Sequence, residues 1–469
     1  MSMRDLAKKL PSPIKHGLKY VYGTIPLPIR YGKVFRETYR ILQESQWWSR
    51  EQLEEYQLQQ LEKLLSHAYE NVPYYKRIFD DRGLKPKDIK SIDDLKKLPY
   101  LTKDIIRENL SDLIAQNYPK SKLQYVTTGG STGIPMGFYW EVGTTTPKEW
   151  AFVWRQWNWA GYRFGQKRVT LRRDVINRSK DGMRQCWEYN PLDNALILSS
   201  FDMTEKNLHK YIEKIYRFKP LVIQGYPSSL FIIANFLKKE NIKLGGIKCI
   251  LTSSETLYQY QRELIEKYFG AVIFDHYGNS ERNALIMQCA KGNYHVISEY
   301  GIVELIEEDG NYVSREGKAG EIIATGFNNY AMPFIRYRTM DLGVYTNQEC
   351  ACGRNYSLLK KIEGRLQDLL VSNNYHLIPL TGIYYEILEE NKSIKQFQFY
   401  QDKPGEVILQ IVKMPHYSER ITNHILRELH KGVESEINFY IKFVDNIPRT
   451  KSGKFRFLIQ KLPIKFGDD

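Results

Sequence analysis

The chain has 469 residues, more than one ordinary hydrophobic core accommodates, so its length predicts two or three domains. Its content of 42% hydrophobic and 13% aromatic residues excludes a disordered or fibrous protein. No apolar run approaches the roughly 20 residues that span a bilayer, the first thirty residues have no secretory pattern, and five cysteines are too few for a disulfide scaffold. We expect a cytoplasmic globular protein.

The positive charge is concentrated near the N-terminus. The formal net charge is +14, and residues 1–50 hold ten Lys/Arg against three Asp/Glu. Such a segment is typical of peripheral contact with anionic membrane lipid, and equally of a solvated basic extension. Nucleic-acid binding is a third alternative, but no DNA- or RNA-binding motif accompanies the charge, so we expect no nucleic-acid partner.

The first clear element is a helix that begins after Ser49. Gln52 follows three residues later and completes a capping box. Apolar residues then recur at helical spacing until Pro73, where the helix is expected to end.

Strands and helices alternate from 221 to 277. The pattern predicts strands at 221–224, 247–254 and 271–277, with two helices between them, the second ending at Gly270. Strand–helix–strand units of this length predict a parallel sheet with helices on its faces. Ligands of such sheets bind beyond the carboxyl ends of the strands, so we expect chemistry there.

The pattern becomes antiparallel after residue 296, with an Asp309–Gly310 turn between two extended runs. A last block has its own strand pair, one helix and a basic tail, which is typical of a small α+β domain. We therefore predict a basic extension (1–48), a large α/β domain with an antiparallel subdomain (49–366) and a small α+β domain (367–469).

Four polar motifs stand out. The first, TTGGSTGIPMG from Thr127 to Gly137, combines glycines that permit tight turns with hydroxyl groups that can bind triphosphate oxygens. It is not a Walker motif, because no Gly-Lys-Ser/Thr follows. An ordinary loop has the same composition.

The second and third motifs follow predicted strands. DHYGNSERN, which starts at Asp275, offers an aromatic ring for a base in Tyr277 and a carboxylate for Mg²⁺ in Glu281. FIRYRTMDLG offers Asp341, which can accept hydrogen bonds from ribose hydroxyls. Each alone is compatible with an ordinary strand-to-loop turn.

The fourth motif, IPRTKSGKFR, places Lys454 after a glycine near the C-terminus. A lysine in such a loop suits a mobile cation that neutralises charge developing on a phosphate. A basic tail is the simpler interpretation of this motif in isolation.

In this order and spacing, the four motifs resemble those of the adenylate-forming ligases. The phenylacetate–CoA ligase branch and its CapK-like capsular-polysaccharide relatives are the most similar, and LPYLTKDIIREN, GYPSSL and TSSETL add to the resemblance. It implies that ATP and Mg²⁺ convert a carboxylic acid into an acyl-adenylate, whose acyl group passes to an acceptor. It also implies a mobile C-terminal lid that rotates about Gln367.

The resemblance assigns roles residue by residue. Lys454 is implied to bridge the carboxylate and the α-phosphate during catalysis, and Glu281 to hold Mg²⁺. The nucleotide-binding residues that it implies are Thr127, Thr128, Gly129, Gly130, Ser131, Thr132 and Gly133 in the phosphate loop, with Ser254, Glu255, Thr256, Tyr277, Gly278, Ser280, Asp341 and Arg365 around adenine and ribose.

Three departures from the family pattern concern Met136, Met340 and the segment after Asp368. Met136 replaces a lysine that the phenylacetate branch also commonly lacks, and Met340 replaces a glycine. After Asp368, LLVSNNYHLIP lacks the glycine-containing sequence that lines the pantetheine tunnel of many CoA ligases. We therefore expect an amine acceptor in cell-surface polysaccharide assembly, with an acyl-CoA ligase and a non-catalytic binding relative as alternatives.

Four Cys/His residues form a possible zinc site. Cys289 and His295 flank five residues, and Cys350 and Cys352 flank one. A Cys₃His set suits tetrahedral Zn²⁺, although buried free cysteines are the alternative. Related sequences carry a similar cluster, and we expect a structural Zn²⁺.

Overall fold

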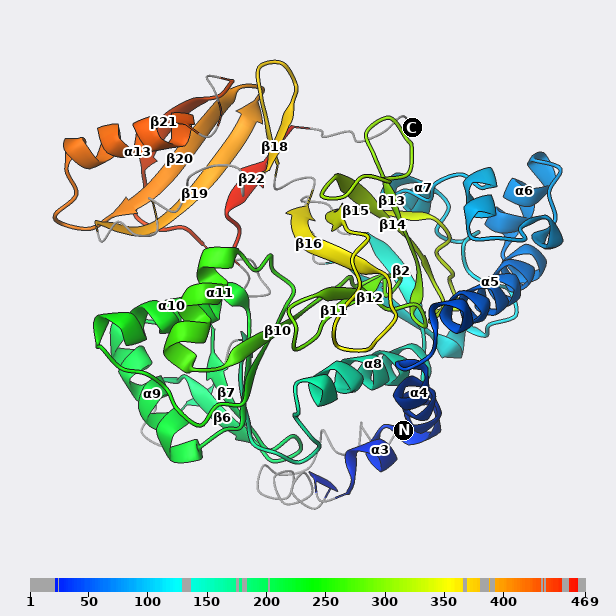
Figure 1. Ribbon diagram of the computed structural model, residues 1–469, viewed down its shortest axis with the longest axis horizontal. Helices are drawn as coiled ribbons and strands as arrows, with labels where there is room; N and C mark the ends of the chain where they lie inside the picture. The colour runs from blue at the N-terminus through cyan, green and yellow to red at the C-terminus, as the bar shows by residue number, and fades with distance from the viewer. Residues whose placement is uncertain are drawn as a thin grey trace.

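The structure is a computed structural model that describes residues 22–23, 25–128, 136–173, 177–178, 184–200, 203–365, 369–379, 388, 393–431, 433, 436–448 and 455–462. Figure 1 shows a large N-terminal unit and a smaller C-terminal unit, drawn in orange and red. The predicted fold class, a large α/β domain with a small α+β domain, is confirmed.

A twelve-stranded sheet forms the centre of the large unit. Its strand order is β13-β14-β15-β16-β12-β11-β10-β9-β8-β3-β7-β6. Strands β7, β3, β8, β9 and β10 run parallel, as the sequence predicted for 221–277, and the remaining pairs are antiparallel. The bounds are β3 (Arg168–Arg173), β6 (Trp187–Asn190), β7 (Ala195–Ser199), β8 (Val222–Gly225), β9 (Cys249–Ser253), β10 (Val272–Gly278), β11 (Leu285–Gln288), β12 (Tyr294–Val296), β13 (Gly301–Ile306), β14 (Ala319–Gly326), β15 (Tyr337–Tyr345) and β16 (Leu358–Arg365).

Helices cover both faces of the parallel strands. On one face, α9 (Glu205–Phe218), α10 (Pro227–Lys239) and α11 (Gln259–Phe269) share a core with the strands. On the other face lie α4 (Gly32–Ser45) and α8 (Thr145–Trp159), whose aromatic residues share a second core. Because α4 buries Phe35 and Leu42 there, part of the predicted 1–48 extension packs into the large unit.

Among the N-terminal elements with described bounds, α3 (Leu27–Arg30) precedes α4, and α5 (Arg50–Asn71) and α6 (Pro73–Asp81) follow it. The Ser49–Gln52 capping box is present at the start of α5, as predicted, and Pro73 occupies the first turn of the next helix. Short elements follow, namely η1 (Pro86–Asp88), η2 (Asp93–Lys97), α7 (Lys103–Glu108), η3 (Lys120–Lys122) and the small strand pairs β1 (Leu123–Thr127) with β2 (Gly137–Glu141) and β4 (Asn177–Arg178) with β5 (Arg184–Gln185).

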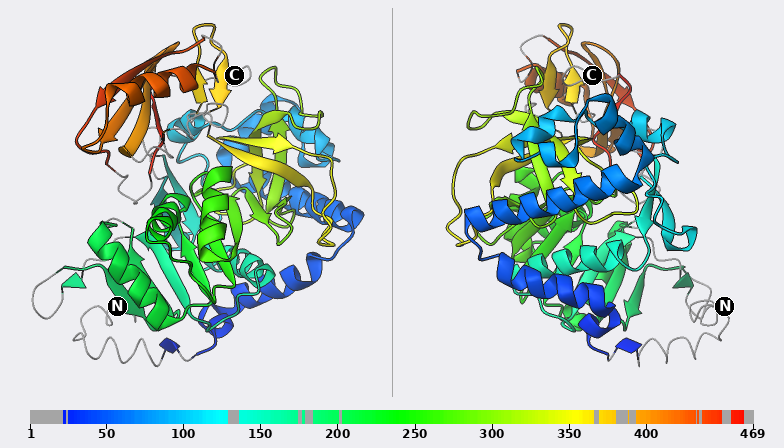
Figure 2. Two further views of the ribbon diagram at one scale, coloured as in Figure 1. Left: turned by 60° about the vertical axis from the view of Figure 1, so that its left-hand side comes forward. Right: turned by 90° about the vertical axis from the view of Figure 1, so that its right-hand side faces the viewer.

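In the described part of the C-terminal unit, helix α13 (Glu419–Lys431) packs on a sheet. Its four strands are β21 (Asn438–Phe443), β20 (Glu406–Lys413), β19 (Ile394–Lys403) and β22 (Leu458–Gln460), in that order. A separate hairpin of β17 (Leu369–Val371) and β18 (Leu377–Pro379) precedes it. The core of this unit includes Tyr258 from the large unit, so the two units are in contact (Figure 2).

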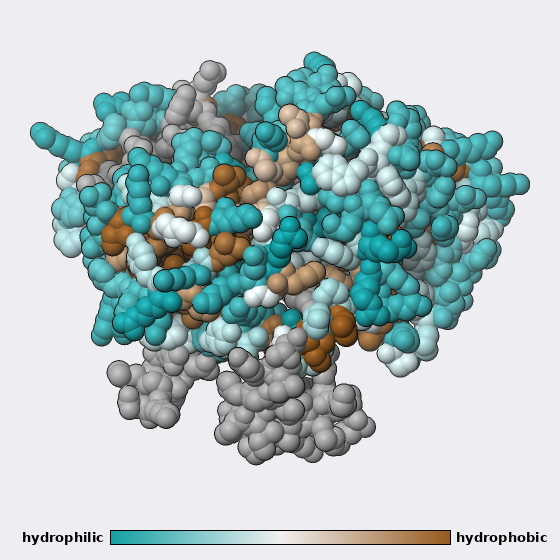
Figure 3. Space-filling view, turned by 60° about the horizontal axis from the view of Figure 1, so that its bottom comes forward, coloured by the Kyte–Doolittle hydropathy of each residue, from teal (hydrophilic) through white to brown (hydrophobic). Residues whose placement is uncertain are grey.

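None of the helices in the described ranges is long and apolar enough to cross a bilayer. On the face drawn in Figure 3, hydrophilic residues predominate, and hydrophobic residues form scattered small groups.

Candidate active site

The predicted nucleotide residues after β9 and those in the DHYGNSERN motif lie where the parallel strands end. Gly225, Ser253 and Gly278 are the last residues of β8, β9 and β10, and the motifs GYPSSL, TSSETL and DHYGNSERN run out of these strands. Their convergence follows from parallel pairing, because the carboxyl ends of parallel strands meet at one edge of a sheet.

Tyr277 and Asp341 are brought together from β10 and β15. The Tyr277 hydroxyl donates a hydrogen bond to Asp341 Oδ2 at 2.7 Å. Burial, followed by the charge of Asp341, raises the pKa of Tyr277 well above its usual value, so this phenol stays protonated and keeps donating. A carboxylate can accept about four hydrogen bonds, and the prediction that Asp341 also accepts ribose hydroxyls is compatible with this contact.

Glu281 is held by a tyrosine that the sequence analysis did not single out. The hydroxyl of Tyr337, which is fully buried, donates to Glu281 Oε1 at 2.6 Å. The second carboxylate oxygen of Glu281 has no hydrogen-bond partner in the described part of the chain. A carboxylate anchored through one oxygen can offer the other to a cation, which fits the predicted Mg²⁺ role.

Ser254 and Glu255 follow β9 and take different partners. Ser254 has a left-handed backbone (φ +73°), a strained conformation of the kind that clusters at functional sites. Its hydroxyl accepts a hydrogen bond from Arg172 at 2.8 Å. Thr256 is half-buried beside them. The prediction that these residues line the adenine site stays a prediction.

The carboxylate of Glu255 connects the two units. Its Oε2 accepts from the backbone N–H of Ser228, in the first turn of α10, and its Oε1 accepts from the backbone N–H of Phe455, both at 3.0 Å. Phe455 directly follows Lys454 in the sequence. The neighbouring ring of Tyr258 packs edge-on against Phe457, with centroids 5.5 Å apart. Glu255 therefore holds the C-terminal segment against the carboxyl edge of the sheet.

The DHYGNSERN loop is also held by contacts with Trp140 of β2. The Trp140 indole donates to the carbonyl oxygen of Ser280 at 3.2 Å, and the Arg282 guanidinium lies 3.6 Å from the centre of the Trp140 ring. Gly278 and Ser280 are exposed. This contact pins the loop that carries Glu281 to the strand pair β1–β2.

The two residues that flank the undescribed part of the predicted phosphate loop, Thr128 and Met136, are hydrogen-bonded to each other. Thr127 ends β1, the Thr128 N–H donates to the Met136 carbonyl at 2.9 Å, and the Met136 N–H donates to Thr128 Oγ1 at 3.0 Å. Met136 is fully buried. The remaining predicted loop residues lie outside the described ranges, and they are Gly129, Gly130, Ser131, Thr132 and Gly133.

The predicted catalytic lysine, Lys454, and the predicted hinge residue, Gln367, also lie outside the described residues. For Arg365 only the main chain is described, and it pairs with Asp341 across β16 and β15. Met340, the residue in place of the usual glycine, has φ +63°. That left-handed backbone explains why glycine suits this position.

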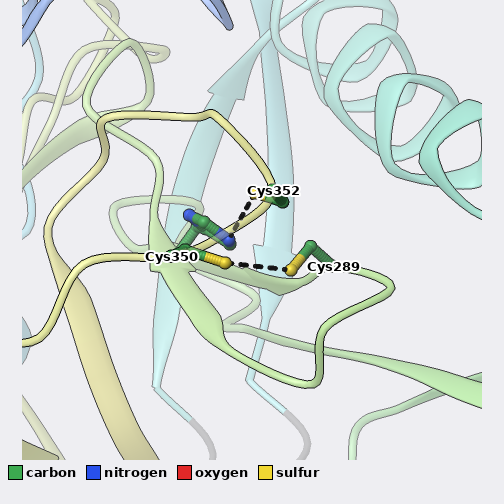
Figure 4. Close-up of side chains that lie close together, drawn as sticks. Cys289, Cys350 and Cys352 are labelled. Atoms are coloured by element: carbon green, nitrogen blue, oxygen red, sulfur yellow. Dashed lines mark hydrogen bonds between the residues drawn. The ribbon is translucent and has the colours of Figure 1, made fainter.

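The structure brings the four predicted zinc ligands together. The ligand atoms of Cys289, His295, Cys350 and Cys352 all lie within 4.8 Å of one another. Cys289 Sγ lies 3.6 Å from Cys350 Sγ, and Cys352 Sγ lies 3.5 Å from His295 Nε2 (Figure 4). Tetrahedral Zn–S and Zn–N bonds of about 2.0–2.3 Å place ligand atoms about 3.3–3.8 Å apart, so the spacing fits zinc.

The surroundings of this cluster fit a metal centre in most respects. The backbone N–H of Lys291 donates to Cys289 Sγ at 3.3 Å, and Asn293 Nδ2 donates to Cys350 Sγ at 3.2 Å. The imidazole of His295 is held by packing, because its buried Nδ1 has no partner in the described part of the chain. Zinc-bound histidines usually donate this second N–H, so the centre departs from the common pattern there.

The chain is similar to known proteins along most of its length. The CapK C-terminal domain family matches residues 370–461. Protein CapK of Staphylococcus aureus is 28% identical over 94% of this chain and 96% of its own length. Phenylacetate-coenzyme A ligase of Aromatoleum evansii is 27% identical over 88% of this chain and 96% of its own length.

Solved structures share the fold. A 2-hydroxyisobutyryl-CoA ligase in the postadenylation state, in complex with R3-HIB-AMP, superposes with a TM-score of 0.69 at 18% identity, covering 88% of this chain and 91% of that one. The same ligase in its thioesterification state, with 2-HIB-AMP and CoA, gives 0.55 at 19% identity over 89% and 92%. These similarities confirm the resemblance to the adenylate-forming ligases, with CapK and the phenylacetate–CoA ligases among the relatives, and the prediction of an AMP-forming ligase.

Proposed function

We propose that this enzyme activates a carboxylic acid with ATP and Mg²⁺ and transfers the acyl group to an amine during assembly of a cell-surface polysaccharide. The observation that carries the adenylation step is the pair of tyrosine-held carboxylates, Glu281 and Asp341, at the carboxyl edge of the sheet. The similarity to CapK along 94% of the chain supports the pathway.

The residues divide the work between binding and charge neutralisation. Tyr277 would lie against the base and Asp341 would bind the ribose hydroxyls. Glu281 would hold Mg²⁺ through the oxygen that Tyr337 leaves available. Adenylation joins an anionic carboxylate to an anionic phosphate, so Mg²⁺ and Lys454 would supply the positive charge that offsets this repulsion.

The segment after the hinge supports an amine acceptor. Asn373, Asn374 and Tyr375 lie at the tip of the β17–β18 hairpin, where Tyr375 is 73% exposed with φ +61°. Asn373 packs so closely on Gly405 that a Cβ there would lie 1.7 Å from its Oδ1. In CoA ligases this segment forms a wall of the pantetheine tunnel, and three side chains with polar groups would crowd the thiol arm while offering hydrogen bonds to an amine-bearing or sugar-bearing acceptor.

Formation of a CoA thioester is the second candidate, because several relatives are named phenylacetate-coenzyme A ligases. A screen of acid-dependent pyrophosphate exchange would identify the acid. Mass spectrometry with amines and CoA present together would then identify the product. We expect an amide, and a CoA thioester as the main product would replace the amide proposal with the thioester one.

We also propose that the Cys₃His cluster binds one structural Zn²⁺, which would tie the β11–β12 turn to the loop before β16. The support is the convergence of four ligand atoms from Cys289, His295, Cys350 and Cys352. Zinc needs deprotonated thiols. Despite burial, hydrogen bonds, first from Asn293, lower the pKa of Cys350, and others, first from His295, lower that of Cys352, whereas burial raises the pKa of Cys289 to about 12.

The basic N-terminus is proposed as a peripheral membrane contact. Residues 1–21 carry five Lys/Arg and one Asp, and each basic residue near anionic lipid contributes roughly 1 kcal/mol. Such a contact would bring the enzyme to the surface where polysaccharide precursors are assembled.

A further inference from the structure

Arg172 and His276 lie in one row of residues at the carboxyl edge of the sheet. The registers place Leu171, Gly225, Thr252 and Asp275 side by side across β3, β8, β9 and β10. The next row along these strands is Arg172, Tyr226, Ser253 and His276. Residues that lie side by side on neighbouring strands point to the same face of a sheet. Phe274, two residues before His276 on β10, packs against α8, so this row lies on the face that α8 covers.

The row consists of hydrogen-bond donors and has no carboxylate of its own. Arg172 Nη2 donates to Ser254 Oγ at 2.8 Å, and its guanidinium lies 5.2 Å from the centre of the Tyr226 ring. No carboxylate in the described part of the chain lies within ion-pair distance of Arg172. The charge of Glu255 acts to raise the pKa of Arg172, but both oxygens of Glu255 accept backbone N–H groups.

His276 has unused hydrogen-bonding capacity. Neither ring nitrogen has a partner among the residues that the structure describes, and the side chain is half-buried. Burial, together with the charge of Arg172, lowers the pKa of His276 to about 3. The imidazole is therefore neutral at neutral pH and offers one N–H donor and one acceptor.

A guanidinium without an ion-pair partner, in the same row as a neutral imidazole on which its charge acts, is a favourable place for an anion. A partly desolvated cation is costly unless it is paired, and guanidinium matches the two oxygens of a carboxylate. Within the row, Ser253 precedes Ser254 and His276 precedes Tyr277 in the sequence. The row therefore borders the predicted adenylate site, although none of its four residues is among the predicted nucleotide-binding residues.

We propose that Arg172, Tyr226, Ser253 and His276 bind a second anionic group of the acid substrate, distal to the carboxylate that reacts. The substrate is thus a dicarboxylate or a carboxylic acid that carries another anionic group. The inference rests on the proposed adenylation, because the acid is activated at the adjoining site.

Stable adenylate analogues with acyl chains of defined length and charge test the proposal. The probes are acylsulfamoyl adenosines with ω-carboxyacyl chains from succinyl to suberyl, each compared with its uncharged ω-carboxamide. Isothermal titration calorimetry measures their dissociation constants on the full-length protein. We expect at least one ω-carboxy analogue to bind about 10–100-fold more tightly than its carboxamide, the range for a hydrogen-bonded charged group.

The variant Arg172→Gln should abolish this preference, and Arg172→Lys should retain part of it. Arg217→Gln is the matched control, since it removes one positive charge from an exposed ion pair on α9 and should leave the preference unchanged. Equal binding within every pair, or a preference that survives in Arg172→Gln, would overturn the proposal. So would an equal loss of MgATP and all analogues in Arg172→Gln, which would assign Arg172 to the nucleotide.

MgATP titrated into the wild-type protein separates the two levels of inference. Absence of MgATP binding would refute the proposed adenylation. Binding of MgATP without binding of any ω-carboxy analogue would refute only the anionic subsite.

Discussion

Replacement of Glu255 by glutamine tests how the C-terminal segment is held for adenylation. Glu255 accepts one backbone N–H from each unit, Ser228 in α10 and Phe455 beside Lys454. A glutamine has only one side-chain oxygen that can accept a hydrogen bond. Its NH₂ group is a donor, so it cannot accept a hydrogen bond from the second backbone N–H. Ser228 is fixed in a helix, whereas Phe455 belongs to the other unit, so the contact with Phe455 should be lost.

The expected effect follows from the strength of one charge-assisted hydrogen bond. Such a bond contributes about 1.5–3 kcal/mol, which corresponds to about 10–150-fold in the equilibrium between the docked and undocked arrangements. The aromatic contact of Tyr258 with Phe457 remains, and a pair of this kind contributes about 0.5–1.5 kcal/mol. We expect the adenylation half-reaction to slow by about 10–100-fold, with acyl transfer from a preformed adenylate much less affected.

Two measurements check this expectation, and Glu263→Gln on the exposed face of α11 is the matched control for charge. Single-turnover kinetics measures the two half-reactions separately. Hydrogen–deuterium exchange of a peptide that contains Phe455 measures local opening and needs no substrate. The role of Glu255 would be refuted if the exchange rate and the adenylation rate of the variant remained within about twofold of wild type. A twofold change corresponds to only about 0.4 kcal/mol.

Four further expectations concern other parts of the molecule. Lys454→Ala should slow adenylation by about 10²–10³-fold with an almost unchanged melting temperature, and near-normal pyrophosphate exchange would refute its catalytic role. Tyr337→Phe removes the hydrogen bond that holds Glu281 and should weaken the apparent Mg²⁺ affinity about tenfold, as measured by the Mg²⁺ dependence of adenylation; an unchanged dependence would argue against Mg²⁺ at Glu281. The purified protein should contain about one equivalent of Zn²⁺ by elemental analysis, and Cys350→Ser should lose both metal and stability; a metal-free wild-type protein with the same melting temperature would end the zinc proposal. Deletion of residues 1–21 should abolish salt-sensitive co-sedimentation with anionic vesicles while keeping α4 in place, and binding that survives the deletion would place the contact elsewhere.

The architecture near the parallel strands was predictable because it depends on local patterns. The runs around β8, β9 and β10 are short and apolar, and the helices between them are amphipathic, so residues 221–277 indicated a parallel sheet whose carboxyl edge carries the ligand. The Ser49–Gln52 box and the Gly270 terminus of α11 were likewise local signals, and both are present. The order of the motifs indicated the family.

Contacts between distant residues were decided by the tertiary structure alone. Tyr337 was visible within its motif, but only the pairing of the sheet brings its hydroxyl to Glu281. His276 lies in the DHYGNSERN motif and Arg172 in none of the motifs, and the two share a row because four strands have one register. Glu255 is predicted to line the adenine site, and only the packing of the two units brings its carboxylate to the backbone N–H groups of both. Sequence patterns thus determined which elements form and what chemistry their residues can perform. Which side chains meet depends on strand register and on packing between units, which link residues too distant in the chain for any local pattern to record.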